Sequence, residues 1–179
     1  PKQNVYQIID KDLVFNLGAS GNKIPQGAYT FIVRGGNLRI KSNLEYDTTT
    51  AISELGSLKQ IPSIAFVVIG GDVKVDARVS KMVGVYYVQS EPVADTANPT
   101  SPATIGGQIT GDWTDPFTEL EIHGSVYGNI NSLLGQRTFA GPANYDHGNV
   151  VLRYDERILL NPPPGLEEYV DLSSERVAR

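Results

Sequence analysis

The residues that could bind a metal or act as nucleophiles are few and widely spaced in this chain. It contains two histidines, His123 and His147, and no cysteine. A zinc site needs about three protein ligands at suitable spacing, and two distant histidines do not supply them. Ser125 lies two residues after His123, but no G-x-S-x-G turn is present to raise a serine nucleophile. The sequence therefore predicts no enzymatic activity, no cofactor and no metal.

Carboxylates occur in near pairs, which is the pattern that glycoside cleavage and calcium binding both use. No Asp-x-Asp-x-Asp-Gly calcium loop is present, and Asp at the ends of strands commonly caps turns. Turn capping and solvated strand faces therefore explain these residues equally well. The pairs are Asp72 with Asp76, Asp112 with Asp115, and Glu119 with Glu121.

Aromatic side chains offer a second kind of chemistry, because exposed rings can stack on sugars. Trp113 lies between Asp112 and Asp115, and Tyr127 follows further along. Tyr86 and Tyr87 are adjacent, so one ring should point inward and the other outward if they lie on a strand. We expect a surface binding set, with the alternative that these rings cover the ends of the core. The set comprises Trp113, Tyr127, Tyr86, Asp112 and Asp115.

The overall charge and hydropathy exclude some partners. The net charge is −5 and the basic residues are scattered, whereas nucleic-acid binding needs clustered Lys and Arg. No run approaches 18 apolar residues, so the sequence predicts no membrane-spanning helix. No signal peptide is visible, and the chain begins at Pro1 without Met. We therefore expect a processed product or a fragment of a longer protein.

The pattern of apolar residues indicates strands. Leu38 and Ile40 alternate with polar residues, as do Val73 and Val75, which is typical of a half-buried strand. Continuous β-branched and aromatic runs, such as residues 64–69 and 82–88, favour buried strands. Only residues 49–58 have a plausible helical pattern. The sequence therefore predicts an all-β protein.

An internal repeat suggests how these strands are arranged. Residues 34–44 (RGGNLRIKSNL) resemble residues 69–79 (IGGDVKVDARV) at an offset of 35, and residues 123–130 form a weaker third copy. A repeat of this length is typical of stacked coils. We predict a parallel β-helix or β-solenoid-like fold, with a β-sandwich as the alternative because the third copy is irregularly spaced.

The expected organisation has three parts. Residues 1–28 form an N-terminal capping segment, residues 29–165 the β-helical domain, and residues 166–179 a polar tail. Residues 89–119 and 133–148 are rich in turn-forming residues and look like long loops. The triple proline at residues 162–164 cannot donate hydrogen bonds to a sheet and should end the domain.

Four segments together resemble a known group of proteins: GGNLRIKSNL, GGDVKVDARVSKMVGVYYVQ, LEIHGSVYGNI and VLRYDERILLNPPPGL. They are similar to the C-terminal β-helical region of large predicted surface or pilus-associated proteins of uncultured, small-genome candidate-phyla bacteria. The resemblance covers residues 29–166, and its most specific part is the closing Y-D-x-R-x-x-x-N-P-P-P-G motif. It implies an extracellular or cell-envelope location and no activity.

These observations favour a non-enzymatic structural or adhesive module of an extracellular bacterial surface protein. The alternative is a carbohydrate-binding or carbohydrate-cleaving β-helix domain. The expected partners are a glycan or a protein on a cell surface. Exposed end strands also suggest end-to-end self-association. We expect neither nucleic-acid binding nor membrane insertion by this segment.

Overall fold

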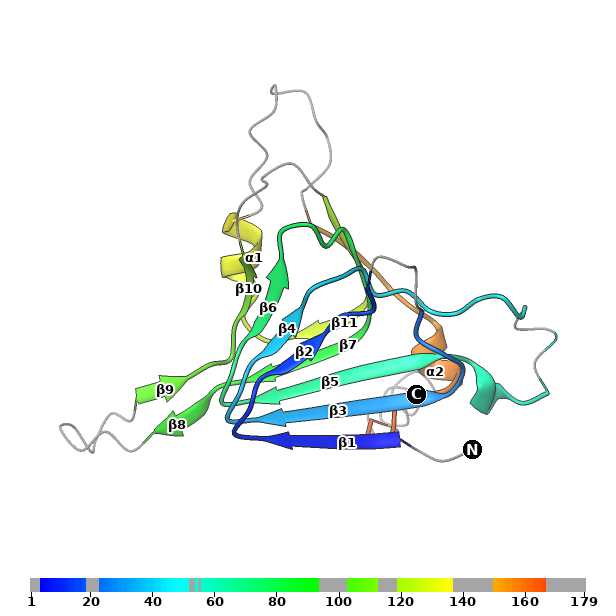
Figure 1. Ribbon diagram of the computed structural model, residues 1–179, viewed down its shortest axis with the longest axis horizontal. Helices are drawn as coiled ribbons and strands as arrows, with labels where there is room; N and C mark the ends of the chain where they lie inside the picture. The colour runs from blue at the N-terminus through cyan, green and yellow to red at the C-terminus, as the bar shows by residue number, and fades with distance from the viewer. Residues whose placement is uncertain are drawn as a thin grey trace, which may run out of the picture.

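The computed structural model describes residues 4–18, 23–51, 54, 56–93, 103–112, 119–136 and 150–166. Strands account for 50% of the described residues and helices for few of them, which confirms the all-β prediction. Among the described residues, no helix is both long and apolar enough to cross a membrane. The strands form two parallel sheets and one short antiparallel ribbon (Figure 1).

The larger sheet, sheet A, has six strands in the order β1-β3-β5-β7-β11-β12, and every neighbouring pair is parallel. Its strands are β1 (Asn4–Ile9), β3 (Ala28–Arg34), β5 (Ser63–Ile69), β7 (Lys81–Gln89), β11 (Leu120–Tyr127) and β12 (Val150–Arg153). Sheet B has the parallel order β10-β6-β4-β2. Its strands are β2 (Leu13–Phe15), β4 (Leu38–Ile40), β6 (Val73–Asp76) and β10 (Ile109–Asp112).

The remaining elements are small. β8 (Glu91–Val93) and β9 (Ala103–Ile105) pair antiparallel and project away from the two sheets (Figure 1). The helices are α1 (Asn131–Gln136) and α2 (Arg157–Leu160). Leu58–Gln60, which begin at the last residue of the segment expected to be helical, form a 3₁₀ turn.

The chain alternates between the two sheets from β1 to β7. Each strand of sheet A is followed by a strand of sheet B, and we call such a pair a level. β1–β2, β3–β4 and β5–β6 are the first three levels, and β7 with β10 forms the fourth, interrupted by the β8–β9 ribbon. Parallel pairing throughout both sheets differs from the antiparallel order of an immunoglobulin-like sandwich.

The sheet register places the first two sequence copies directly beside each other. Leu38 pairs with Val73 and Ile40 with Val75, both at the offset of 35. The third copy of the repeat does not lie at residues 123–130, where the sequence predicted it. Gly124 lies opposite Gly84 of β7, whereas Ile109 of β10 is the residue that pairs with Val73. The turn before β10 therefore continues the series, and residues 123–130 do not.

The core between the sheets contains a ladder of stacked rings. Tyr6, Phe31, Phe66 and Tyr86 occupy one register position in four successive strands of sheet A. Their ring centroids are 4.9, 5.6 and 5.4 Å apart along the series, with interplanar angles of 16°, 21° and 16°. Phe15 of sheet B packs edge-on against Phe31 and Phe66. Each such aromatic contact stabilises the fold by about 0.5–1.5 kcal/mol beyond its burial.

Glycines at the turn from sheet A to sheet B allow successive levels to approach closely. A Cβ on Gly36 would lie 2.2 Å from the carbonyl oxygen of Lys11, and a Cβ on Gly71 would lie 1.9 Å from that of Gly36. The residue before each has a left-handed conformation, with φ +70° at Gly35 and at Gly70. Glycine at positions 35 and 70 adopts the left-handed conformation without strain, and glycine at positions 36 and 71 leaves room for the neighbouring carbonyl group.

The closing motif packs on the outer face of sheet A, on the side opposite the stacked rings. Ile158 of α2 and Leu166 contact Ala65 and Val85. The Thr30 hydroxyl of β3 donates a hydrogen bond to the carbonyl oxygen of Pro164 at 2.7 Å. The last described residues are therefore bonded to the second level of the stack, 134 residues earlier in the chain. We call residues 155–166 the clasp.

The polar residues of the motif hold the clasp in place. Asp155 is 3% exposed, and its Oδ1 accepts hydrogen bonds from the backbone N–H and Nη1 of Arg157 at 3.1 and 3.2 Å. The Arg157 guanidinium lies 5.5 Å from the centroid of the Tyr46 ring. Burial, and next the charge of Asp155, raise the pKa of the Tyr46 hydroxyl. Asn161 Nδ2 donates to the carbonyl oxygens of Ile61 and Lys59 at 2.7 and 3.3 Å.

Replacing Gly71 by Ala should destabilise the protein by about 1–3 kcal/mol, because the added methyl group must displace the Gly36 carbonyl. Urea unfolding followed by circular dichroism measures the effect. Gly56→Ala is the control, since a Cβ there meets only Gln60 Oε1, at 3.6 Å. Equal midpoints for the two variants would contradict the close approach of levels at this turn.

Asn161→Ala should lower the free energy of unfolding by about 1–3 kcal/mol, because two carbonyl groups under the clasp lose their donor. The neighbouring Leu159→Ala, at a side chain that is 48% exposed, should change it far less. Hydrogen exchange provides a second readout, with faster exchange expected at residues 155–166 in the Asn161 variant. An unchanged exchange rate there would show that this side chain does not hold the clasp.

Candidate functional site

The structure separates the two adjacent tyrosines of β7. Tyr86 is fully buried and lies in the ring ladder, which corrects the surface position expected for it. Its hydroxyl donates to the carbonyl oxygen of Val83 at 2.9 Å, and burial raises its pKa well above the usual value. Tyr87 points to the outer face and is half-buried. The strand alternation predicted one inward and one outward ring, but it did not show which was which.

The outer face of sheet A brings Tyr87 next to Tyr127, its partner in the register between β7 and β11. The two ring centroids are 6.3 Å apart and the rings are tilted by 40°. Tyr127 is 55% exposed. We call these two residues the tyrosine pair. Tyr127 was expected at the surface from the sequence, and Tyr87 takes the place that had been given to Tyr86.

A charged cluster occupies the same face of β11. Glu121 Oε1 lies 2.9 Å from His123 Nε2 and also contacts Arg153 Nε of β12. The neighbouring His123 side chain, followed by the hydrogen bond from Arg153, lowers the pKa of the Glu121 carboxyl. Residues 121, 123 and 127 are an even number of positions apart on one strand, so their side chains lie on the same face of the sheet. The charged cluster and the tyrosine pair therefore face the same side.

This arrangement limits the catalytic interpretation of the Glu119 and Glu121 pair. Glu121 contacts His123 and Arg153, whereas Glu119 is exposed and precedes β11. A glycosidase needs one carboxyl held protonated and a second one facing it. The lowered pKa of Glu121 is the opposite of what a general acid requires. The face can instead stack rings and form charged hydrogen bonds, which are binding interactions.

Four other sequence candidates lie wholly or partly outside the described residues. Asp112 ends β10, where its backbone pairs with Asp76, but its side chain is not described. Trp113 and Asp115 follow it in the undescribed range 113–118, and His147 lies in 137–149. Their proposed binding roles stay predictions.

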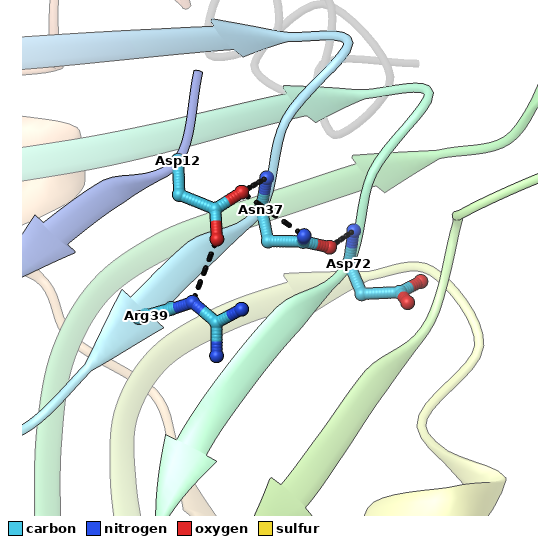
Figure 2. Close-up of polar contacts among 4 residues, drawn as sticks. All are labelled: Asp12, Asn37, Arg39 and Asp72. Carbon is cyan, nitrogen blue, oxygen red and sulfur yellow. Dashed lines mark hydrogen bonds and ion pairs between the residues drawn. The ribbon is translucent and has the colours of Figure 1, made fainter. Parts of the chain in front are cut away.

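The carboxylates considered for calcium have structural partners. Asp12, Asn37 and Asp72 occupy the same turn position in successive levels (Figure 2). Asp12 Oδ1 accepts from the backbone N–H and the Nδ2 of Asn37 at 2.8 and 3.0 Å. Asn37 Oδ1 accepts from the Asp72 backbone N–H at 3.1 Å. Asp72 Oδ1 then accepts from the Gln108 backbone N–H at 3.2 Å. We call these four residues the turn ladder.

The turn ladder and nearby ion pairs account for both Asp72 and Asp76. Asp76 lies 3.6 Å from Lys41 Nζ and 3.3 Å from Arg78 Nε. Within the ranges that the structure describes, no three His, Asp or Glu residues gather in a way that could hold a metal ion. The sequence signal for the ladder was available, since an Asp or Asn directly follows each of the first two Gly–Gly turns.

A small pocket lies beside the clasp. Its volume is about 200 Å³, and Asp47, Thr48, Thr50 and Arg157 provide its polar lining. Arg157 is the cation of this set, and Asp155 already engages its guanidinium. The pocket is therefore a weaker binding candidate than the tyrosine pair.

Asp12→Asn should remove part of the acid sensitivity of the fold. The backbone hydrogen bond from Asn37, followed by the bond from Arg39, lowers the pKa of Asp12 from 3.8 to about 2. A folded-state pKa below the unfolded one contributes stability that is present above about pH 4 and lost as the pH falls toward 2. Melting temperatures between pH 2.5 and 7 should therefore fall less steeply in the variant. Parallel curves would contradict this role of Asp12.

No protein-family model, curated protein or solved structure matches this chain. The likeness to candidate-phyla surface proteins therefore remains a hypothesis that rests on the sequence segments alone.

Proposed function

We propose that this chain is a non-enzymatic, β-helical structural module of an extracellular bacterial surface protein. Its role is to form a rigid support from which neighbouring segments reach a partner on a cell surface. One observation carries the proposal. The chain alternates between two parallel sheets, so that every level is hydrogen-bonded to the next along both sheets.

The clasp supports the same role. It links residues near the end of the described chain to β3 and to the segment before β5. Unfolding from either end must therefore break contacts with the second or third level. A body closed in this way is suited to mechanical support. The β8–β9 ribbon projects from it (Figure 1), as expected for a segment displayed to a partner.

Binding of a carbohydrate is the second candidate, and the tyrosine pair is the observation that favours it. Tyr127 presents an exposed ring, and Glu121, His123 and Arg153 supply charged hydrogen-bonding groups on the same side. Aromatic rings beside such groups are a common arrangement for orienting a ligand. The lowered pKa of the Glu121 carboxyl argues against the general-acid role that cleavage would require of one carboxyl.

A glycan array probed with the purified chain separates the two functions. The structural role predicts no glycan-specific signal for the wild type. Carbohydrate binding at the tyrosine pair predicts a specific signal that falls at least about tenfold in Tyr127→Ala. Burial of one large apolar side chain contributes about 1.5–3 kcal/mol, and about 1.4 kcal/mol corresponds to a tenfold change in affinity.

Leu58→Ala is the matched control, because Leu58 is also exposed, by 58%, and lies outside the tyrosine pair. A signal that is lost in Tyr127→Ala and kept in the control would favour carbohydrate binding and contradict the purely structural role. A signal that survives in both variants would place the glycan elsewhere and contradict the tyrosine pair as its site.

A further inference from the structure

The turns from sheet A to sheet B have a direction. A Cβ on Gly36 would point at Lys11 of the first level, and a Cβ on Gly71 would point at Gly36 of the second. The turn before β10 differs, because Gly107 holds the register position of Gly71 and its Cβ would lie 2.7 Å from the Ser90 nitrogen. At the turns of the second and third levels, the Cβ position therefore faces the carbonyl group of the level before it.

Lys11 occupies this turn position in the first level. It precedes Asp12 as Gly36 precedes Asn37, and Leu13 pairs with Leu38 two residues later. The residue before it, Asp10, has φ +54°, close to the +70° of Gly35 and Gly70. The first turn therefore has the same backbone form as the later ones, but it carries a side chain where they have none.

We propose that Lys11 closes the β1–β2 end of the stack to a further level. Its Cβ stands at the point where the carbonyl group of an added level would have to lie. Inside the stack, a Cβ added at Gly36 or at Gly71 would lie 2.2 or 1.9 Å from the carbonyl oxygen of the level before it. Both distances are far below any normal contact between a Cβ and an oxygen.

This end needs such protection, because its strands offer an open template. β1 and β2 are the end strands of the two sheets, and Val5, Tyr6 and Val14 are 52%, 45% and 55% exposed. An exposed apolar edge strand pairs readily with another chain, and lysine is a common means of preventing it. Lys11 is exposed and forms no ion pair with any described residue.

The partner that Lys11 excludes is a second copy of this chain. The opposite end of sheet A is β12, which would continue the parallel order if it were placed against β1 of another molecule. The end-to-end association suggested by the exposed end strands is therefore blocked at this turn. One glycine substitution should remove the block.

Sedimentation velocity over a range of protein concentrations tests the proposal with the 179-residue chain. Wild type and Lys11→Ala should remain monomeric, because both keep a Cβ. Lys11→Gly should self-associate at least about tenfold more tightly. The amides of β1 should then exchange more slowly as its concentration rises, which distinguishes edge pairing from aggregation of unfolded chains.

Each alternative outcome overturns the proposal in a different way. A folded Lys11→Gly variant that stays monomeric would show that the Cβ of Lys11 does not close the end. Association of both variants would assign the protection to the charge of the lysine. Association of the wild type with slowed exchange in β1 would show that the end is open.

Discussion

The close approach of successive levels at the turn from sheet A to sheet B is the constraint on which the structure depends. Both sheets are parallel, so each level must leave sheet A, turn and enter sheet B directly above the level before it. The backbones then lie so close that a Cβ at Gly36 or Gly71 would overlap a carbonyl group. Glycine at this turn is therefore a condition for the register of both sheets.

The same approach explains the polar residues beside the turn. Neighbouring strands leave backbone N–H groups at the turns that need acceptors. The side chains of Asp12, Asn37 and Asp72 supply them, each to the level that follows. Carboxylates that resemble a calcium or catalytic set in the sequence are thus hydrogen-bond acceptors between levels. The stacked rings of the core extend the same repeat into the interior.

Sheet A has two apolar faces, and this decides where a binding surface can form. The inner face packs against sheet B, and the clasp covers part of the outer face through Ile158 and Leu166. The covered part cannot contact a partner without displacement of the clasp. What remains open on the described part of β7 and β11 includes the tyrosine pair and the cluster around Glu121. The closing motif, which forms the clasp, therefore packs against sheet A, and the candidate binding surface lies on the uncovered part of the same face.

The all-β character, the strand positions around residues 38, 64–69 and 73, and the role of the Gly–Gly turns could be predicted from local patterns. Alternating apolar residues and β-branched runs fix which backbone conformation is favourable. The offset of 35 between two copies also matched neighbours in the sheet. The third copy was misplaced although the spacing is almost kept, since Ile109 pairs with Val73 at an offset of 36. The Gly106–Gly107 turn is followed by Gln108 and not by Asp or Asn, so its local pattern resembles the first two copies less.

The sequence by itself determined that this chain forms strands, that Asp or Asn follows its glycine turns, and that its basic residues are not clustered. Only the tertiary structure decided which ring of the Tyr86 and Tyr87 pair is exposed. Only the tertiary structure joined Asn161 to Ile61 and Thr30 to Pro164, and Glu121 to His123 and Arg153. The physical reason is that Asn161, Pro164 and Arg153 lie on other segments than the residues they contact. Their proximity therefore depends on how the strands and the clasp pack and not on spacing along the chain.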